Sequence, residues 1–240
     1  MSLKQILALS SSRVGNEAYL ESAVPFIKKF LGDRSLKIAF IPFASVNKNY
    51  DEYVNNVSTA LSALPYTIAL ADHGNAKEII EQSDVIMVGG GNTFKLLYDM
   101  YEAGIVEIIR AKINAGVSYI GWSAGSNILS PTIGTTNDMP VIQPQSFKSL
   151  GVFPFQINPH YYNKHAEGFN GETRDQRLFE FVTMNPSLKV IGLPEGTYLQ
   201  LHGSVLKFVG KLPGVLFCKD DNAEPATRQI EQGEDLSFLL

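Results

Sequence analysis

The hydrophobic pattern of the first half of the chain alternates between short apolar runs and longer amphipathic stretches. The short runs are nearly continuous in Val, Ile, Leu and Ala, which is typical of parallel strands that are covered on both faces. They predict five strands, the first with its following loop, at 4–12, 36–44, 66–72, 84–92 and 117–123. Apolar residues at helical spacing predict helices at 15–32, 49–64, 75–83 and 93–116, the last broken into two near Gly104.

This alternation predicts an α/β fold, a doubly wound and mostly parallel sheet with helices on both faces. Ligands of such sheets bind beyond the carboxyl ends of the strands. The second, fourth and fifth predicted strands end in the segments 42–44, 89–92 and 122–125. We therefore expect a functional site at the edge of the sheet where these three segments meet.

The pattern changes after about residue 185, where short apolar strands are joined by turns that contain glycine. Residues 189–220 predict an antiparallel β extension of the same domain. The chain shows no internal repeat, low-complexity tract or linker. We therefore expect a single α/β domain that spans residues 1–240.

Composition narrows the range of partners. The 240 residues can bury a sizeable core, and acidic and basic residues are interleaved to a net charge of −4. No basic stripe indicates a nucleic-acid or membrane surface, no apolar run approaches the ~18 residues of a membrane span, and the N-terminal apolar stretch is too short for a signal peptide. The single cysteine, Cys218, excludes an internal disulfide and argues against a cysteine metal site. We expect a cytoplasmic protein without a metal, a cofactor, or a nucleic-acid or membrane partner.

Residues 121–125, Gly-Trp-Ser-Ala-Gly, match the G-x-S-x-G nucleophile elbow. In an elbow, a strained turn from strand to helix exposes the serine hydroxyl, and the glycines leave room for the turn. The motif follows an apolar strand, so Ser123 is the candidate nucleophile and the Ala124 amide a candidate oxyanion donor. The alternative interpretation is a tight strand–helix junction in which Ser123 is buried or caps the helix.

A serine nucleophile needs a general base, and the chain has four histidines. His160 follows an apolar, strand-like segment and a proline that restricts the local backbone, so it is the histidine best placed at the edge of the sheet. The other three, His73, His165 and His202, are interpreted as residues without a role in the site.

The base in turn needs an acid that orients it, and two carboxylates qualify. Glu195 ends a Val/Ile strand and lies between Pro194 and Gly196. Asp138 lies in the loop that follows the elbow, where it could also form a turn. The residue pattern leaves the choice between Glu195 and Asp138 open.

A second glycine-rich loop, residues 89–91, follows the fourth predicted strand. It is not a dinucleotide-binding fingerprint, because Phe94 occupies the place of the third glycine. Its exposed amides suit an anion instead. We expect the amide of Gly90 or Gly91 to complete an oxyanion hole opposite Ala124.

Six motifs together resemble serine peptidase family S51 in their order and spacing, over roughly residues 5–200. These motifs are VGGGNTF, YIGWSAGSN, TTNDMP, QINPH, GETRDQR and IGLPEG. The resemblance implies a fold similar to that of class I glutamine amidotransferases, with serine in place of their cysteine nucleophile. It also implies hydrolysis of dipeptides with an N-terminal aspartate, Asp-Xaa, through an acyl-enzyme.

The resemblance also implies roles for individual residues. The family's serine falls on Ser123, its histidine on His160, and the glutamate described as its third triad member on Glu195. Its functionally implicated aspartate falls on Asp138.

Selection of aspartate requires a cation, and the motif GETRDQR supplies Arg174 and Arg177. At helical spacing the two arginines share a face, and the alternative is a solvated face with weak ion pairs. The resemblance favours Arg174, whose planar guanidinium matches a carboxylate bidentately. Recognition of the free amino group falls to Asp138 or to carbonyls near it, and Asn137 is included among the substrate-binding residues.

Three alternatives stay open. A related serine hydrolase could use the same residues on other acidic substrates, such as β-aspartyl links or cyanophycin-type polymers. A non-catalytic α/β binding module could keep the pocket without turnover. An amidotransferase-like domain with a partner subunit is disfavoured, because the elbow carries serine instead of cysteine. The sequence leaves the oligomeric state, monomer or homodimer, undetermined.

Overall fold

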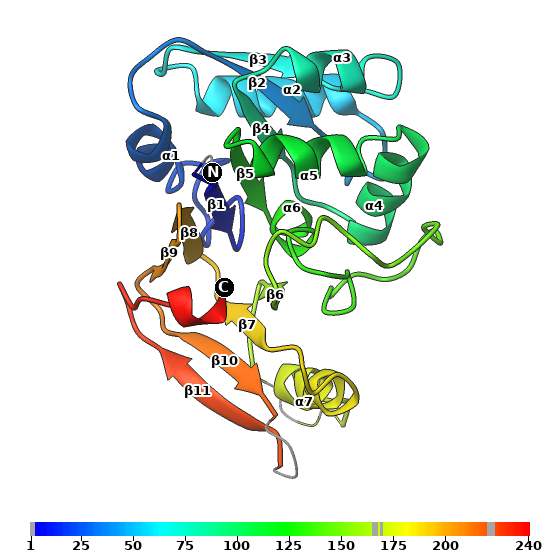
Figure 1. Ribbon diagram of the computed structural model, residues 1–240, viewed down its shortest axis with the longest axis vertical. Helices are drawn as coiled ribbons and strands as arrows, with labels where there is room; N and C mark the ends of the chain where they lie inside the picture. The colour runs from blue at the N-terminus through cyan, green and yellow to red at the C-terminus, as the bar shows by residue number, and fades with distance from the viewer. Residues whose placement is uncertain (1–2, 165–167, 169, 220–223) are drawn as a thin grey trace.

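The structure, a computed structural model, describes residues 3–164, 168, 170–219 and 224–240. His165, one of the four histidines, lies outside the described residues. Figure 1 shows a large sheet with helices on both sides and, beyond it, a smaller sheet that carries one long helix.

The large sheet has seven strands in the order β3-β2-β4-β5-β1-β8-β9. The first five strands in this order run parallel, and β8 and β9 continue the sheet as an antiparallel hairpin beside β1. Their bounds are β1 Gln5–Leu9, β2 Leu36–Ile41, β3 Tyr66–Leu70, β4 Val85–Val88, β5 Ser118–Trp122, β8 Tyr198–His202 and β9 Val205–Val209.

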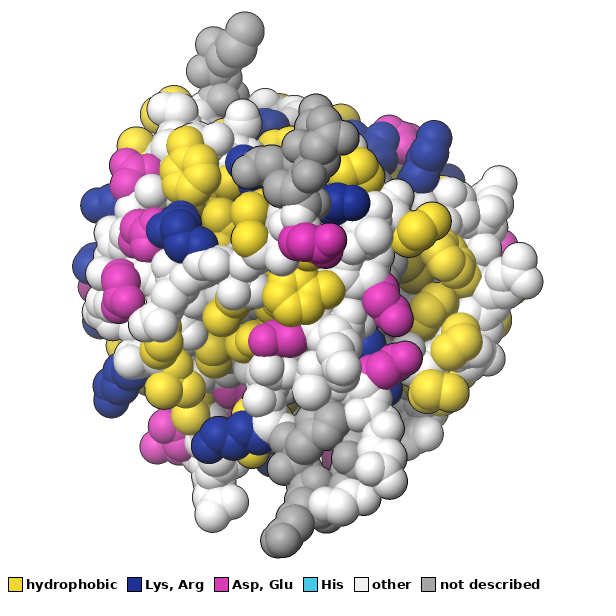
Figure 2. Space-filling model, turned by 90° about the horizontal axis from the view of Figure 1, so that it is seen from below, with side chains coloured by type: hydrophobic (Ala, Val, Ile, Leu, Met, Phe, Trp, Pro, Cys, Tyr) yellow, Lys and Arg dark blue, Asp and Glu magenta, His cyan; other side chains and the backbone are white. Residues whose placement is uncertain are grey.

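The small sheet has four strands in the order β11-β10-β7-β6. Strands β6 and β7 are parallel, whereas β10 runs antiparallel to both of its neighbours. Their bounds are β6 Gln156–Pro159, β7 Val190–Leu193, β10 Gly214–Cys218 and β11 Ala226–Ile230. On the face of the molecule in Figure 2, both signs of charge are distributed over the surface and neither forms one continuous patch.

The helices cover both faces of the large sheet (Figure 1). Along β1, Leu7 and Leu9 pack in one apolar core with α1 and α2, whereas Ile6 and Ala8 pack in a second core with α3, α4, α5 and α6. Strand residues alternate between the two faces, so each central strand must be apolar throughout. The helices are α1 Val24–Leu31, α2 Tyr50–Ala60, α3 Ala76–Glu81, α4 Thr93–Glu102, α5 Val106–Asn114, α6 Ala124–Asn127, α7 Arg174–Met184 and the 3₁₀ helix η1 Ser237–Leu239.

The predicted α/β class and the five parallel strands are confirmed, and two details differ. The helix predicted at 15–32 begins only at Val24, because Leu20 adopts a left-handed backbone (φ 56°) and Pro25 lies in the first helical turn, where its missing N–H is tolerated. The C-terminal extension predicted at 189–220 is divided between two sheets, since β8 and β9 join the large sheet whereas β7 and β10 belong to the small sheet; β11, which pairs with β10, lies beyond the predicted range. No helix among the described residues is long and apolar enough to span a membrane.

Candidate active site

The elbow serine lies between β5 and α6 in a strained backbone conformation. Ser123 has φ 52° and ψ −116°, a region that side chains with a Cβ rarely adopt. The two glycines of the motif are required by packing. A Cβ on Gly125 would lie 2.2 Å from the carbonyl oxygen of Val88, and one on Gly121 would lie 2.4 Å from that of Gly125. The motif is therefore an elbow in geometry as well as in sequence.

Hydrogen bonds fasten the elbow to the neighbouring strand β1. The Ser123 amide donates to the Leu9 carbonyl at 3.2 Å. The Ser126 hydroxyl lies 2.7 Å from the same carbonyl oxygen and 2.9 Å from that of Gly121. Because Ser126 is fully buried, these bonds form away from competing water and hold the strained turn in place.

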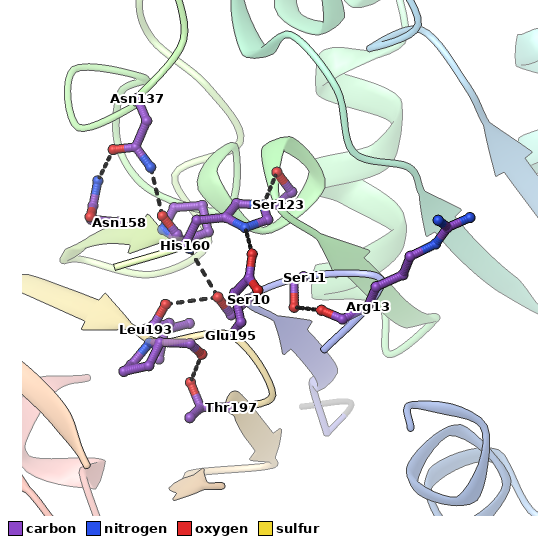
Figure 3. Close-up of polar contacts among 12 residues, drawn as sticks. Ser10, Ser11, Arg13, Ser123, Asn137, Asn158, His160, Leu193, Glu195 and Thr197 are labelled. Carbon is purple, nitrogen blue, oxygen red and sulfur yellow. Dashed lines mark hydrogen bonds and ion pairs between the residues drawn. The ribbon is translucent and has the colours of Figure 1, made fainter. Parts of the chain in front are cut away.

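Three residues from distant parts of the chain form a hydrogen-bonded series (Figure 3). The Ser123 Oγ lies 2.9 Å from His160 Nε2, and His160 Nδ1 lies 2.7 Å from Glu195 Oε1. Ser123 follows β5, His160 follows β6 and Glu195 follows β7. Ser123 is half-buried, and the His160 side chain is 39% exposed, so a substrate can approach both. This is the order of contacts that a nucleophile, a base and an orienting acid require.

Ser10, which was not among the predicted site residues, joins the two strand ends that carry the histidine and the glutamate. Its hydroxyl accepts a hydrogen bond from the His160 amide at 2.9 Å and donates one to the Leu193 carbonyl at 2.7 Å. His160 itself has φ 52°, so its backbone needs such support. The available signal was position, since Ser10 follows the first predicted strand at the same edge of the sheet.

Asp138 lies near the triad but does not orient the histidine. Its Oδ2 accepts hydrogen bonds from the Thr93 amide at 2.7 Å and from the Thr136 hydroxyl at 3.0 Å. The carboxylate therefore stabilises the start of α4, where the helix dipole favours a negative charge. Glu195 is the carboxylate at hydrogen-bond distance from His160 Nδ1.

Two cavities meet at the Ser123–His160 pair. The first, here named the Arg174 cavity, has a volume of about 220 Å³, and its charged residues besides His160 are Arg174 and Asp138. The second, here named the Arg13 cavity, has a volume of about 430 Å³. Ser123 and His160 line both cavities. The reacting atoms thus stand at the junction of two separate spaces.

The residues predicted to supply oxyanion donors line the two cavities that meet at Ser123. A Cβ on Gly90 would lie 2.9 Å from the Ser123 Cβ, so only glycine permits this approach of the loop to the elbow. Gly91 also lines the Arg13 cavity, whereas Ala124 lines the Arg174 cavity. The amides of Gly90, Gly91 and Ala124 donate no hydrogen bond to any residue in the described part of the chain.

Tyr53, which the sequence analysis did not single out, fixes the glycine loop. Its hydroxyl donates to the Gly90 carbonyl at 2.9 Å and accepts from the Trp122 indole at 3.2 Å. Burial raises the pKa of Tyr53, so the hydroxyl keeps the proton that it donates. Gly89 leaves room for this contact, because a Cβ there would lie 2.5 Å from the Tyr53 hydroxyl oxygen.

The two arginines of α7 differ in their surroundings. Arg174 is half-buried against its cavity, with NH1 at 3.4 Å from Asn158 Oδ1. Burial and the neighbouring Arg177 lower the pKa of Arg174. Arg177 is exposed and lies 3.5 Å from Glu172. Of the pair, Arg174 is the residue that faces the site.

Asn137 lines the Arg174 cavity, and both ends of its amide already have protein partners. Its Nδ2 donates to the Pro159 carbonyl at 2.7 Å, and its Oδ1 accepts from Asn158 Nδ2 at 2.6 Å (Figure 3). These bonds hold the residues directly before His160.

The other described histidines lie outside both cavities. His73 stacks on Phe43 and lies 3.4 Å from a carboxylate oxygen of Asp99, which also pairs with the buried Lys95. His202 ends β8 and is exposed. Within the described ranges, no group of three or more His, Cys, Asp or Glu side chains is arranged to hold a metal ion.

Comparison with known proteins identifies the family. The model of the family described as Peptidase family S51 matches residues 6–209. The chain belongs to peptidase family S51. It is 47% identical over 235 residues to Peptidase E of Shewanella oneidensis, covering 98% of each chain. It is 45% identical over 230 residues to Peptidase E of Haemophilus influenzae, covering 95% of this chain and 97% of the relative.

A solved structure agrees with this S51 fold. The crystal structure of a peptidase from an acI-B1 actinobacterium matches with a TM-score of 0.68 at 18% identity, covering 98% of this chain and 97% of the other. At this identity the match speaks for the fold alone. Family membership makes this chain a serine peptidase, as the resemblance of its motifs implied.

Proposed function

We propose that this S51 peptidase hydrolyses dipeptides with an N-terminal aspartate, Asp-Xaa, through an acyl-enzyme on Ser123. The observation that carries the proposal is the continuous Ser123–His160–Glu195 series beside a small cavity with one arginine and one aspartate. Relatives that bear the name Peptidase E, such as those at 45% and 47% identity, support the same assignment.

In the proposed reaction, His160 Nε2 takes the Ser123 proton as the hydroxyl oxygen attacks the peptide carbonyl carbon. Glu195 holds the imidazole in the productive tautomer through Nδ1 and stabilises its charged form. The amides of Gly90 or Gly91 and of Ala124 stabilise the oxyanion, and losing one such donor typically costs on the order of 10²-fold in rate. His160 then protonates the departing amine, and a water molecule activated by the same histidine hydrolyses the ester.

Substrate recognition is assigned to the Arg174 cavity. Arg174 binds the side-chain carboxylate of the substrate's aspartate. Asp138 binds the free ammonium group of the substrate through Oδ1, because Oδ2 accepts the hydrogen bond from the Thr93 amide. Asn137 contributes by holding the chain before His160 in place. A volume of about 220 Å³ suits one small residue, so a long N-terminal extension of the substrate is excluded.

The side-chain preference can be tested at Arg174. We expect Arg174→Gln to reduce kcat/KM for Asp-Leu by about 100-fold and that for Asn-Leu much less, because a charge-assisted pair to the substrate carboxylate is lost. The measurement is kcat/KM for both dipeptides. Arg177→Gln is the matched control, since this exposed neighbour is paired with Glu172 on the surface, and it is expected to keep the preference.

If Arg174→Gln keeps the wild-type ratio of Asp-Leu to Asn-Leu hydrolysis, the assignment of Arg174 is wrong. Including β-linked Asp-Leu in the same assay distinguishes an α-aspartyl dipeptidase from a hydrolase of β-aspartyl substrates. Wild-type hydrolysis of only the β-linked peptide would contradict the proposed function.

A further inference from the structure

The two cavities divide the site at the bond to be cleaved. They share Ser123 and His160, whereas their remaining lining residues differ. A peptide whose scissile carbonyl lies on Ser123 must therefore place one residue in each cavity. With the N-terminal residue in the Arg174 cavity, the leaving residue enters the Arg13 cavity.

The lining of the Arg13 cavity carries one fixed charge. Among the described residues, its wall consists of polar, glycine and aromatic residues, with Arg13 as the charged side chain besides the titratable His160. The lining is Ser12, Arg13, Tyr19, Tyr53, Asn56, Gly90, Gly91, Trp122, Ser123 and His160. A single cation in an otherwise uncharged space selects for an anion.

The loop after β1 holds this arginine in a defined place. The Ser11 hydroxyl donates to the Arg13 carbonyl at 2.7 Å, and the Arg13 guanidinium carbon lies 5.6 Å above the ring of Tyr19. Tyr19 in turn packs edge-to-face against Tyr53 and Trp122, with ring centroids 6.2 Å apart in both pairs. The aromatic cluster beside the elbow thus supports the cation and limits its motion.

The position of Arg13 in the lining of its cavity suits a second anchor point for the substrate. Figure 3 shows Arg13 extending on the opposite side of the Ser123–His160 pair from Asn137. In a dipeptide, the free carboxylate carbon lies about one residue length, ~3.8 Å, beyond the scissile carbonyl carbon. Arg13 lines the same cavity as Ser123, and a guanidinium can bind a carboxylate with two parallel N–H groups.

We propose that Arg13 binds the free C-terminal carboxylate of the leaving residue and thereby restricts hydrolysis to dipeptides. This inference rests on the proposed function. A zwitterionic Asp-Xaa carries an ammonium group and two carboxylates, and the site offers Asp138, Arg174 and Arg13 to match them. A longer peptide presents a neutral amide at the position of the second carboxylate, which leaves the Arg13 charge unmatched.

The test compares Asp-Leu with its C-terminal amide, Asp-Leu-NH₂. We expect wild type to prefer the free acid, and Arg13→Gln to lose about 10- to 100-fold in kcat/KM for Asp-Leu, mainly through KM, while hydrolysis of the amide stays within about threefold. The ratio of acid to amide hydrolysis therefore falls toward one in Arg13→Gln. Arg34→Gln, an exposed arginine outside both cavities, is the matched control and is expected to keep the wild-type ratio.

Each outcome of this assay decides the proposal. An unchanged acid-to-amide ratio in Arg13→Gln, or a wild type that cleaves both substrates equally, overturns the role of Arg13 and leaves the proposed function intact. Failure of wild type to cleave either substrate overturns the proposed function and this inference with it. Arg174→Gln separates the two arginines, since it is expected to weaken cleavage of both substrates and to preserve their ratio.

Discussion

Replacing His160 by asparagine is expected to lower kcat/KM for Asp-Leu by at least about 10⁴-fold. Without the imidazole, Ser123 Oγ loses the ring nitrogen at 2.9 Å that accepts its proton in the proposed reaction. Asparagine is the appropriate replacement, because residue 160 has φ 52° and asparagine tolerates the left-handed region better than alanine does. The backbone of the site is thereby kept while the base is removed.

Glu195→Gln is expected to lower activity less than His160→Asn does. The Glu195 side chain is 50% exposed, so water can replace part of its interaction with the imidazole. We therefore expect a loss on the order of 10²–10³-fold in kcat. Steady-state kinetics of the two variants, with thermal unfolding to establish that both are folded, measures the difference. A folded His160→Asn with activity near that of wild type would exclude His160 as the base.

The second large effect is expected at a residue that touches no substrate. Gly125→Ala would place a Cβ 2.2 Å from the Val88 carbonyl oxygen, a backbone atom that cannot move aside independently. The turn must shift, and both Ser123 and the Ala124 amide shift with it. Because a displacement of about 1 Å can cost 10²-fold and loss of an oxyanion donor a similar factor, we expect kcat to fall by at least about 10³-fold.

Gly74→Ala is the control for the glycine variant. Residue 74 lies in an exposed loop, and its nearest atom to an added Cβ is Asp72 Oδ1 at 3.4 Å, an ordinary contact. We expect this variant to have wild-type kinetics. If Gly125→Ala keeps kcat within about threefold of wild type, the close packing of the elbow against β4 does not position the nucleophile.

The sequence predicted the large sheet because central parallel strands carry a strong signal. Strands that are buried on both faces must be largely apolar along their length, as β4 and β5 are. Along the chain, these strands alternate with amphipathic helices. The segment 15–23 misled the helix prediction, because its apolar residues have helical spacing but the left-handed backbone of Leu20 interrupts the helix.

Strand pairing in the C-terminal region could not be predicted from the pattern. Alternation of apolar residues indicates that β8 to β10 are strands, but it does not predict which sheet edge each strand joins. That choice depends on long-range pairs such as Leu7 with Gln200 and Leu216 with Ile191.

The sequence predicted some residues of the candidate site and missed others, and the reason is whether their placement depends on local or on long-range contacts. Ser123 and the glycines follow from a local turn, which a short motif can specify. Ser10 and Tyr53 take part through contacts with residues far away in sequence, such as the hydrogen bond between Ser10 and His160, which are 150 positions apart, and no short motif marks them. The contact of His160 Nδ1 with Glu195 and not with Asp138 likewise depends on long-range packing that no local pattern specifies.

Covalent labelling with a fluorophosphonate, followed by peptide mass spectrometry, measures directly whether the hydroxyl at the elbow is an activated nucleophile. We predict a single adduct on Ser123 in wild type, strongly slowed labelling in His160→Asn, and neither adduct nor Asp-Leu hydrolysis in Ser123→Ala. Hydrolysis of Asp-Leu by folded Ser123→Ala at the wild-type rate, or an adduct on a different residue, would contradict the account.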